Sequence, residues 1–232
     1  MGPSALRPLS DRAGQRSTSM EIIAIDKPYG WRSTQVVEWV KRTLRVRKAG
    51  HAGTLDPLAT GLVLVGVERA TRYLAELQAL PKEYYVLVIF GYRTRSGDAE
   101  FAPEPVQTPE PLGLSERKAL LAQFTGQILQ RPPAFSALKV QGQRAYTLAR
   151  AGQALTLRPR LVEIYALEEV YYEPPARWLL RLSCSKGTYV RSLAEDLGTA
   201  TGWGAYVGAL RRTRIGSYVV SDAIQPERYA SA

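Results

Sequence analysis

The segment from Gly50 to Gly61, GHAGTLDPLATG, constrains the fold of this chain more than any other. Its three glycines permit backbone conformations that other residues rarely adopt, which predicts a loop from Arg47 to Gly61. The apolar run Leu62–Val67 follows at once and is typical of a buried strand. Loops held on rigid core elements commonly carry functional residues, so we expect the chemistry of the protein to lie here.

Strand-like and helix-like segments alternate irregularly along the chain. Apolar and β-branched runs predict strands over Met20–Ile25, Leu62–Val67, Tyr84–Phe90, Leu161–Tyr172, Trp178–Cys184 and Ala205–Val220. The spacing of apolar residues predicts helices over residues 33–44, 69–80, 114–124 and 145–150, and one more after Thr188. The pattern favours an α+β fold in one domain over residues 20–232, with a mixed, largely antiparallel central sheet and flanking helices.

Three local features are predicted from the same pattern. Ser33 or Thr34 is expected to cap the first helix, and Thr188 the last, because hydroxyl side chains accept from the free N–H groups of a helix start. The continuous apolar run Tyr84–Phe90 predicts a central strand that is buried on both faces. Cys184 is expected to be a buried strand residue without a reactive role.

The net charge of +10 indicates a polyanionic partner, because neutralising phosphates releases counterions; a basic protein without such a partner is the alternative. Most of the cations are arginines, which bind phosphates and stack on bases, and this favours RNA. One histidine and one cysteine cannot form a disulfide or a Cys/His metal site. The chain contains neither a P-loop nor a Gly-x-Gly-x-x-Gly motif, so we expect no nucleotide cofactor.

The amino-terminal end lacks the apolar segment of a secretion signal. Residues 1–19 are basic and polar, and we expect them to be either a disordered tail or sequence upstream of a start at Met20. No apolar run approaches the ~20 residues of a membrane span. These observations favour a cytoplasmic protein.

Asp56 precedes Pro57, and an aspartate in this position is most often a turn residue. The context changes this interpretation, because Gly50–Gly61 resembles the central motif of the TruB-type pseudouridine synthases, Gly-His-x-Gly-x-Leu-Asp-Pro-x-Ala-x-Gly. Further segments resemble other motifs of that family, in the family's order over residues 20–220. They are Asp26–Gly30, Lys82–Tyr84, Ser136–Lys139 with Gly142 and Tyr146, Cys184–Arg191, and Leu210–Arg212.

The chain departs from the family pattern in three places. Arg32 stands where the family usually has threonine. Residues 97–101 read Gly-Asp-Ala-Glu-Phe where the family has Ser-Asp-Ala-Asp-Gly. Bacterial members usually continue into a small C-terminal RNA-binding (PUA) domain, for which a chain ending at residue 232 is expected to leave no room. The last departure concerns the strength of tRNA docking more than the chemistry.

The resemblance implies conversion of uridine 55 to pseudouridine in the T-loop of tRNA, by base flipping, cleavage of the glycosidic bond and formation of a C-glycoside. It implies no cofactor and no metal. Asp56 matches the family's catalytic aspartate, and its carboxylate either attacks C1′ of the ribose or removes a proton from the sugar. The expected partner is the T-arm of tRNA; we expect a monomer with no obligate protein partner and no membrane association.

The resemblance also assigns substrate-binding residues. Tyr84 matches the tyrosine that stacks on the target base, and Arg191 the arginine that pairs with the catalytic aspartate. Tyr189 and Leu210 match residues that line the uracil pocket, and His51 matches the residue inserted where the base leaves the loop. From residue type alone, Tyr84 would be interpreted as a core aromatic and Arg191 as a solvated helix residue.

Four cations are candidates for phosphate contact or for scaffold support: Lys27, Lys139, Arg211 and Arg212. Two other functions remain open. A non-catalytic RNA-binding protein would need the basic surface but not Asp56. A hydrolase would need Asp56 together with a second acid in the same pocket, for which Asp98 or Glu195 is available.

Overall fold

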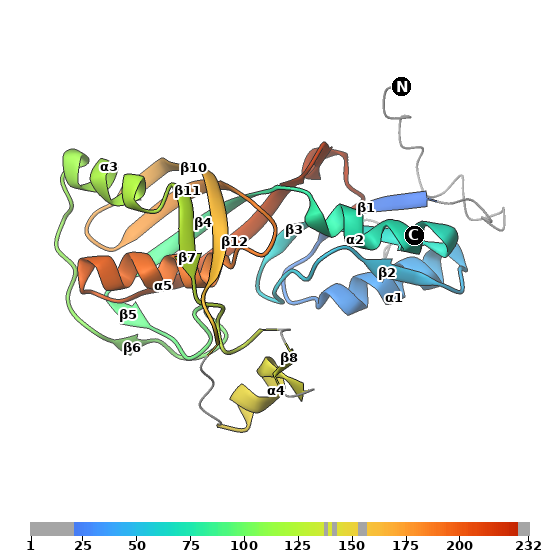
Figure 1. Ribbon diagram of the computed structural model, residues 1–232, viewed down its shortest axis with the longest axis horizontal. Coiled ribbons are helices and arrows are strands. Elements are labelled where there is room, and N and C mark those ends of the chain that lie inside the picture. The colour runs from blue at the N-terminus through green and yellow to red at the C-terminus, as the bar shows by residue number, and fades with distance from the viewer. Residues whose placement is uncertain (1–20, 137–138, 141–142, 153–156, 227–232) are drawn as a thin grey trace. The chain divides into compact units, whose positions relative to one another are not determined.

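The computed structural model describes residues 21–136, 139–140, 143–152 and 157–226, which form two compact units (Figure 1). The first unit combines the chain up to Lys82 with the stretch from Arg211 onward, and the second comprises residues 83–210. Strand β12, Ala205–Ile215, contributes its first half to the second unit and its second half to the first. The single domain predicted over residues 20–232 stays a prediction. The tail at residues 1–19 lies outside the described residues.

The sheet of the first unit is built around β3, Thr60–Val67, whose residues are almost all buried. β1, Glu21–Lys27, and β2, Ala49–His51, both pair with β3 in antiparallel fashion. The second half of β12 joins β3 in parallel, and β13, Tyr218–Val219, pairs back onto β12. Residues of these strands form an apolar cluster with Ala52 and Leu77: Ala24, Leu62, Leu64 and Ile215.

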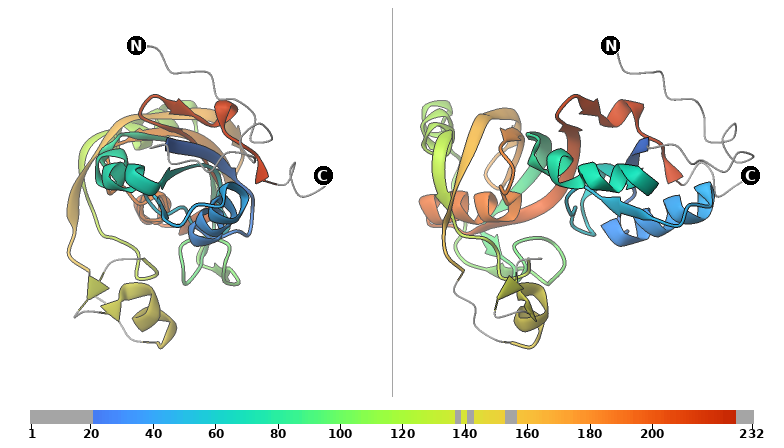
Figure 2. Two further views of the ribbon diagram at one scale, coloured as in Figure 1. Left: turned by 90° about the vertical axis from the view of Figure 1, so that its right-hand side faces the viewer. Right: turned by 45° about the vertical axis from the view of Figure 1, so that its right-hand side comes forward.

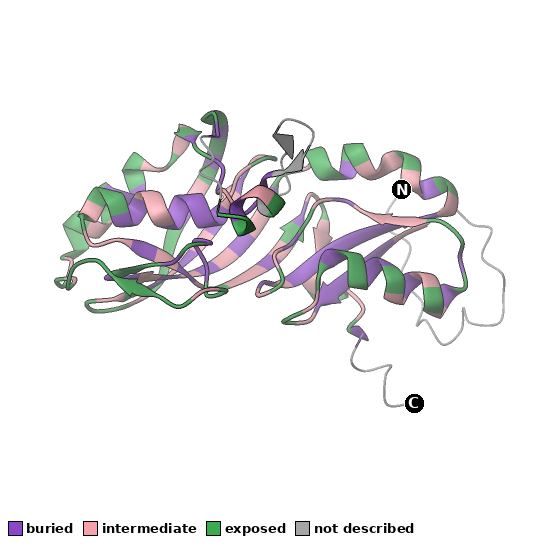
Figure 3. Ribbon diagram, turned by 90° about the horizontal axis from the view of Figure 1, so that it is seen from below, coloured by how far each residue is buried: buried purple, intermediate pink, exposed green. Residues whose placement is uncertain are grey.

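Helices cover this sheet. α1, Ser33–Leu44, contacts β2 and β3, and α2, Leu74–Ala79, contacts β3 (Figures 1 and 2). Two short 3-10 helices, Glu68–Tyr73 and Val220–Asp222, complete the unit. α1 carries buried and exposed residues on opposite sides (Figure 3), because its apolar positions recur at helical spacing: Val36, Val37, Val40 and Leu44.

The strands of the second unit follow the order β12, β4, β11, β10, β7. Their bounds are Lys82–Phe90 for β4, Arg177–Cys184 for β11, Arg160–Glu173 for β10 and Gly126–Gln130 for β7. Two small pairs are β5, Tyr92–Arg93, with β6, Glu104–Pro105, and β8, Lys139–Val140, with β9, Gln143–Arg144. The helices are α3, Leu114–Gln123, α4, Ala145–Arg150, and α5, Val190–Thr201.

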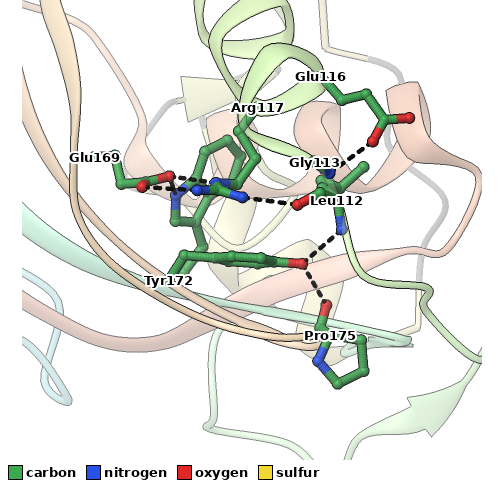
Figure 4. Close-up of polar contacts among 8 residues, drawn as sticks. Leu112, Gly113, Glu116, Arg117, Glu169, Tyr172 and Pro175 are labelled. Atoms are coloured by element: carbon green, nitrogen blue, oxygen red, sulfur yellow. Dashed lines mark hydrogen bonds and ion pairs between the residues drawn. The ribbon is translucent and has the colours of Figure 1, made fainter.

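A polar network fastens the start of α3 to β10 (Figure 4). Arg117 Nε donates to Glu169 Oε2 over 2.6 Å, and the guanidinium carbon lies 4.4 Å from the centre of the Tyr172 ring. Arg117 also donates to the carbonyl of Leu112, whose own N–H donates to the Tyr172 hydroxyl. The hydrogen bond from Arg117 lowers the pKa of Glu169. Glu169 therefore stays negatively charged, and its ion pair with Arg117 holds the start of α3 against β10.

The predicted α+β fold with a mixed, largely antiparallel sheet is confirmed. The predicted pairing of strands 161–172 and 178–184 is present as β10 and β11, and Cys184 is buried as expected. None of the described helices is long and apolar enough to cross a membrane.

Several local predictions are wrong. The N-cap of α1 is Arg32, and that of α5 is Tyr189, so neither helix uses the predicted hydroxyl cap. The side chain of Thr188 donates instead to the carbonyl of Ser185. β4 is fully buried on one face only, because alternate residues are half-buried.

Three predicted segments are subdivided in the structure. Part of the loop expected over residues 47–61 is strand β2, because its backbone pairs with β3. The helix expected over residues 69–80 begins as a 3-10 turn, whose first residue, Glu68, has a φ of +48°. The strand expected over residues 205–220 ends at a turn where Gly216 has a φ of +55°.

Candidate active site

The loop that carries Asp56 runs from the end of β2 to the start of β3. Asp56 is half-buried, and its own carbonyl accepts from the N–H of Ala59 over 3.0 Å. The residue before it, Leu55, is held on both sides by the Ser33 hydroxyl. That oxygen accepts from the Leu55 N–H over 2.9 Å and donates to the Leu55 carbonyl over 3.1 Å. The backbone on either side of Asp56 is therefore fixed.

Lys27 lies at the end of β1 and has no exposed surface. Its ammonium donates to the carbonyls of Trp31 over 2.6 Å, Pro28 over 3.1 Å and Pro57 over 3.1 Å. Burial lowers the pKa of Lys27 to about 8, and the nearby Asp56 carboxylate opposes that shift. These contacts favour scaffold support over phosphate contact for Lys27.

Arg212 is also almost fully buried, at 2% exposure. Its guanidinium donates to the carbonyl of Leu62 over 2.7 Å, and over longer distances to those of Thr54 and Gly53, 3.5 and 3.4 Å. β12 approaches β3 so closely that a Cβ on Gly61 would lie 2.2 Å from the Arg212 carbonyl oxygen. Glycine at position 61 permits this approach, and the contacts of Arg212 again favour scaffold support.

Together these contacts satisfy the carbonyls of five consecutive residues, Gly53–Pro57. We call this segment, with the side chains of Lys27, Ser33 and Arg212 that hold it, the Asp56 cradle. A typical hydrogen bond contributes about 0.5–1.5 kcal/mol, so five paired carbonyls restrain the backbone of the cradle. The arrangement fixes the backbone from which the Asp56 carboxylate extends.

Arg211 differs from its neighbour because 41% of its side chain is exposed. It donates to both carboxylate oxygens of Asp26, over 3.0 and 2.8 Å, and to the hydroxyl of Thr60 over 3.2 Å. The exposed part of Arg211 leaves phosphate contact possible, and this stays a prediction. The side chain of Lys139 lies outside the part of the chain that the structure describes.

His51 ends β2, opposite Val65 of β3, and is half-buried. Burial lowers the pKa of His51, and the charge of Arg212 adds to that effect, so the imidazole is neutral at pH 7. Its Nδ1 atom has no hydrogen-bond partner among the described residues. A neutral ring suits the predicted stacking role of His51 better than a phosphate contact.

In the second unit, Tyr84 lies on the buried face of β4 with 7% of its surface exposed, and Leu210 is half-buried in β12. Tyr189 is held by Gln130, a residue that sequence reasoning missed. The Gln130 amide accepts from the Tyr189 N–H over 2.7 Å and donates to the Tyr189 carbonyl over 2.9 Å. Gln130 is 1% exposed, so this clamp lies in the core.

Arg191 lies in the first turn of α5 and is 6% exposed. Its guanidinium donates to the carbonyl of Ser96 over 2.9 Å and to that of Phe135 over 2.8 Å. It is therefore a buried residue rather than a solvated one. The predicted pairing of Arg191 with Asp56 stays a prediction, since the two residues belong to different units.

The second acids proposed for a hydrolase lie near Arg191. The Asp98 carboxylate accepts from the Ser96 hydroxyl over 2.5 Å and from the Glu100 N–H over 3.0 Å, which gives it a structural task. Burial raises the pKa of Glu195, and the charge of Arg191 opposes this. No group of three His, Cys, Asp or Glu side chains that could hold a metal ion is found within the described residues.

Two residues that depart from the family pattern, Glu100 and Phe101, contact side chains further along the chain. Glu100 forms an ion pair with Arg150 at the end of α4. The Phe101 ring lies 5.2 Å from that of Phe135, centre to centre. These two side chains tie the loop before Phe101 to the segment that follows β7.

The fold resembles that of chains in two solved Cbf5 complexes. In the crystal structure of the archaeal box H/ACA sRNP Nop10–Cbf5 complex, one chain matches with a TM-score of 0.66 and 28% identity, covering 95% of this chain and 54% of that one. A Cbf5–Nop10–Gar1 complex gives a TM-score of 0.68 and 29% identity, covering 96% and 57%. This chain therefore spans little more than half the length of those proteins.

Family models define the class. The model described as TruB family pseudouridylate synthase, N-terminal domain, matches residues 41–190. That of the tRNA pseudouridylate synthase B C-terminal domain matches residues 191–229. The class of protein that these models define is the pseudouridine synthases.

The chain belongs to the TruB family of pseudouridine synthases, and the resemblance to that family is confirmed. It is 44% identical over 214 residues to tRNA pseudouridine synthase B of Aquifex aeolicus (strain VF5), covering 90% of this chain and 73% of the relative. The enzyme of the same name from Ralstonia pickettii (strain 12J) is 42% identical over 220 residues, covering 91% and 67%.

Proposed function

We propose that this chain isomerises uridine to pseudouridine in tRNA and that Asp56 is the catalytic carboxylate. The observation that carries the proposal is the Asp56 cradle, in which the carbonyls of five consecutive residues are hydrogen-bonded around one half-buried aspartate. Such rigidity serves catalysis, because a misplacement of about 1 Å can slow a reaction ~10²-fold.

The reaction breaks the N1–C1′ bond of uridine and forms a C5–C1′ bond, while C5 loses a proton and N1 gains one. Atoms and electrons therefore balance without a cofactor. Asp56 either forms an ester with C1′ as the uracil leaves, or removes a proton from the sugar to release the base. Both routes use the carboxylate of Asp56, and Lys27 places a positive charge near it.

The remaining site residues complete the proposal. Tyr84 would stack on the uracil, which contributes about 1–3 kcal/mol for a typical base on an aromatic ring. Tyr189 and Leu210 would line the pocket, and Arg191 would pair with the catalytic carboxylate. The neutral ring of His51 would fill the space left by the flipped base and so offset part of the unstacking energy.

An open pocket on the first unit supports contact with the RNA backbone. It is lined by Lys48, Glu68, Arg69, Thr71 and Arg72. Glu68 is engaged with the chain itself, because its carboxylate accepts from the N–H of Arg47 over 2.7 Å. Three cations against one engaged carboxylate give the pocket a positive potential that suits phosphates.

We further propose that the target is uridine 55 in the T-loop, that the protein acts as a monomer in the cytoplasm, and that it needs no obligate partner. Static light scattering of the protein with and without tRNA tests the oligomeric state. A stable dimer in either sample would contradict a monomeric enzyme.

The target is tested with two tRNA transcripts that carry tritium at C5 of uracil. One has uridine at position 55, and the other has cytidine there. We expect label to be released only from the first, because isomerisation expels the C5 hydrogen of the target base. Equal release from both transcripts would contradict position 55 but not the reaction. Binding without release from either would leave a non-catalytic RNA-binding protein.

A further inference from the structure

Ser33 lies at the start of α1 and is 3% exposed, yet its hydroxyl serves a loop 22 residues further along the chain. The oxygen accepts from the Leu55 N–H and donates to the Leu55 carbonyl, over 2.9 and 3.1 Å. A hydroxyl has one donor and two acceptor positions, so this one side chain satisfies both polar groups of Leu55.

The helix itself does not need this hydroxyl. The start of α1 is closed by Arg32, whose N–H donates to the Gln35 side chain over 2.7 Å and whose carbonyl accepts from the Gln35 N–H over 3.0 Å. A serine near a helix start commonly bonds neighbouring backbone groups of its own segment. In this protein the side chain is directed to the Asp56 cradle instead.

The geometry determines what this contact does to Asp56. The Leu55 carbonyl and the Asp56 N–H belong to one peptide plane, so holding that carbonyl fixes the plane from which the Asp56 side chain leaves the backbone. The Asp56 carbonyl is held in turn by the Ala59 N–H over 3.0 Å. With both neighbouring peptide planes fixed, only side-chain rotation remains to aim the carboxylate.

We infer that Ser33 is a positioning residue for the isomerisation: its hydroxyl fixes the Leu55 peptide groups and thereby aims the Asp56 carboxylate. This inference rests on the proposed function of Asp56. It assigns Ser33 no contact with substrate. Ser33 acts on the chemical step, and tRNA affinity does not depend on it.

The test compares three variants of the full chain. Ser33→Ala removes the hydroxyl, and Ser33→Thr keeps it. Thr34→Ala is the matched control, since Thr34 is the exposed neighbour on the same helical turn. Single-turnover tritium release and tRNA Kd are measured for each, at a temperature well below every Tm. A merely structural serine would change the Tm and leave the rate of the folded enzyme unaltered.

For Ser33→Ala we expect a rate roughly 10- to 100-fold lower, because the effect of small misplacements on rate is large, with a Kd within about 2-fold of the wild type. Ser33→Thr is expected to return to within about 3-fold of the wild-type rate, and Thr34→Ala to match the wild type. An unchanged rate in Ser33→Ala would overturn the inference. So would a Ser33→Thr enzyme as slow as Ser33→Ala, or a rate loss explained by a weaker Kd.

Amide hydrogen exchange separates this inference from the proposed function. In Ser33→Ala the Leu55 amide should exchange at least about 10-fold faster than in the wild type, while the amides of β3 keep their protection. This result does not depend on activity. If the wild type releases no tritium, the proposed function fails. Faster exchange at Leu55 would still support the contact between Ser33 and Leu55. Unchanged exchange at Leu55 would show that the Ser33 hydroxyl does not hold the Leu55 backbone.

Discussion

The two units hold their site residues with the same kinds of contact, applied over different lengths of chain. In the Asp56 cradle, Lys27 and Arg212 together donate to three carbonyls of one short segment, those of Gly53, Thr54 and Pro57. Lys27 also donates to the carbonyls of Pro28 and Trp31, and Arg212 to that of Leu62. In the second unit, Arg191 donates to the carbonyls of Ser96 and Phe135, which lie far apart in the sequence. The first arrangement fixes the conformation of one loop, and the second fixes the distance between two segments.

The buried ammonium of Lys27 is bonded by backbone carbonyls rather than by a carboxylate, and this matters for Asp56. A carboxylate partner would satisfy Lys27 equally well, but it would repel Asp56 and compete for the same positive charge. Backbone carbonyls carry only partial charges, so the charge of Lys27 remains available to Asp56. Buried charges usually need such complete hydrogen bonding to be tolerated.

The largest expected effect concerns the close approach that the cradle requires. Gly61→Ala would place a Cβ 2.2 Å from the Arg212 carbonyl oxygen, at a φ of +107°. We expect the free energy of unfolding to fall by about 3 kcal/mol or more, measured by urea denaturation.

The matched control is Gly30→Ala in the same unit. Gly30 has a φ of +82° but no atom within 4 Å of its added Cβ. Its expected loss is about 1 kcal/mol, from backbone strain alone. Equal losses for the two variants would show that the approach of β12 to β3 is not what Gly61 provides.

A second test asks whether the second unit depends on its clamp as the first depends on its cradle. Gln130→Leu removes the side-chain amide that bonds the backbone N–H and carbonyl of Tyr189. We expect the free energy of unfolding to fall by about 2 kcal/mol and the isomerisation rate to fall roughly 10-fold. Gln127→Leu, at an exposed position of the same strand, is expected to change neither quantity appreciably. If the two variants behave alike, the Gln130 clamp does not order the Tyr189 backbone.

The pH dependence of stability tests the buried charge of the cradle. The pKa of Lys27 is lowered from 10.5 to about 8 by burial. Between these values the unfolded chain holds a proton that the folded chain lacks, so the free energy of unfolding rises with pH, by at most about 1.4 kcal/mol per pH unit.

Lys27→Met lacks this proton in both states. The stability difference between wild type and Lys27→Met should therefore grow in favour of the wild type as pH rises from 8 towards 10.5, and stay level below pH 8. Chemical denaturation at several pH values measures it. A constant difference up to pH 10 would mean that Lys27 keeps an ordinary pKa.

The smallest expected effect concerns the open pocket of the first unit, which is lined by Lys48, Arg69 and Arg72 among others. Lys48→Gln and Arg69→Gln should each weaken tRNA binding about 2- to 3-fold and reduce the slope of log K against log salt concentration by about 1. Lys118→Gln, on an exposed part of α3, is the control and should leave the slope unchanged. An unchanged slope in both pocket variants would exclude phosphate contacts there.

Six strands of the sheet, β1, β3, β4, β10, β11 and β12, could be predicted because their signal is local, whereas β2 and β7 were missed. Apolar runs and turn residues mark β3, β10 and β11, and the family motif marks Asp56. The cradle could not be predicted, because its acceptors are backbone carbonyls, which every residue has. Lys27 and Arg212 give no sign in the sequence that they are buried rather than solvated. The only signal for Ser33 was a small polar residue at a helix start, and it predicted a cap.

The most direct test of the central claim is single-turnover tritium release from tRNA labelled at C5 of uracil, comparing the wild type with Asp56→Asn. The substitution keeps the size of the side chain and removes its charge. We predict release by the wild type and none detectable by Asp56→Asn, with tRNA affinity retained by both. Release by Asp56→Asn at a rate near that of the wild type would contradict the assignment of Asp56 as the catalytic carboxylate.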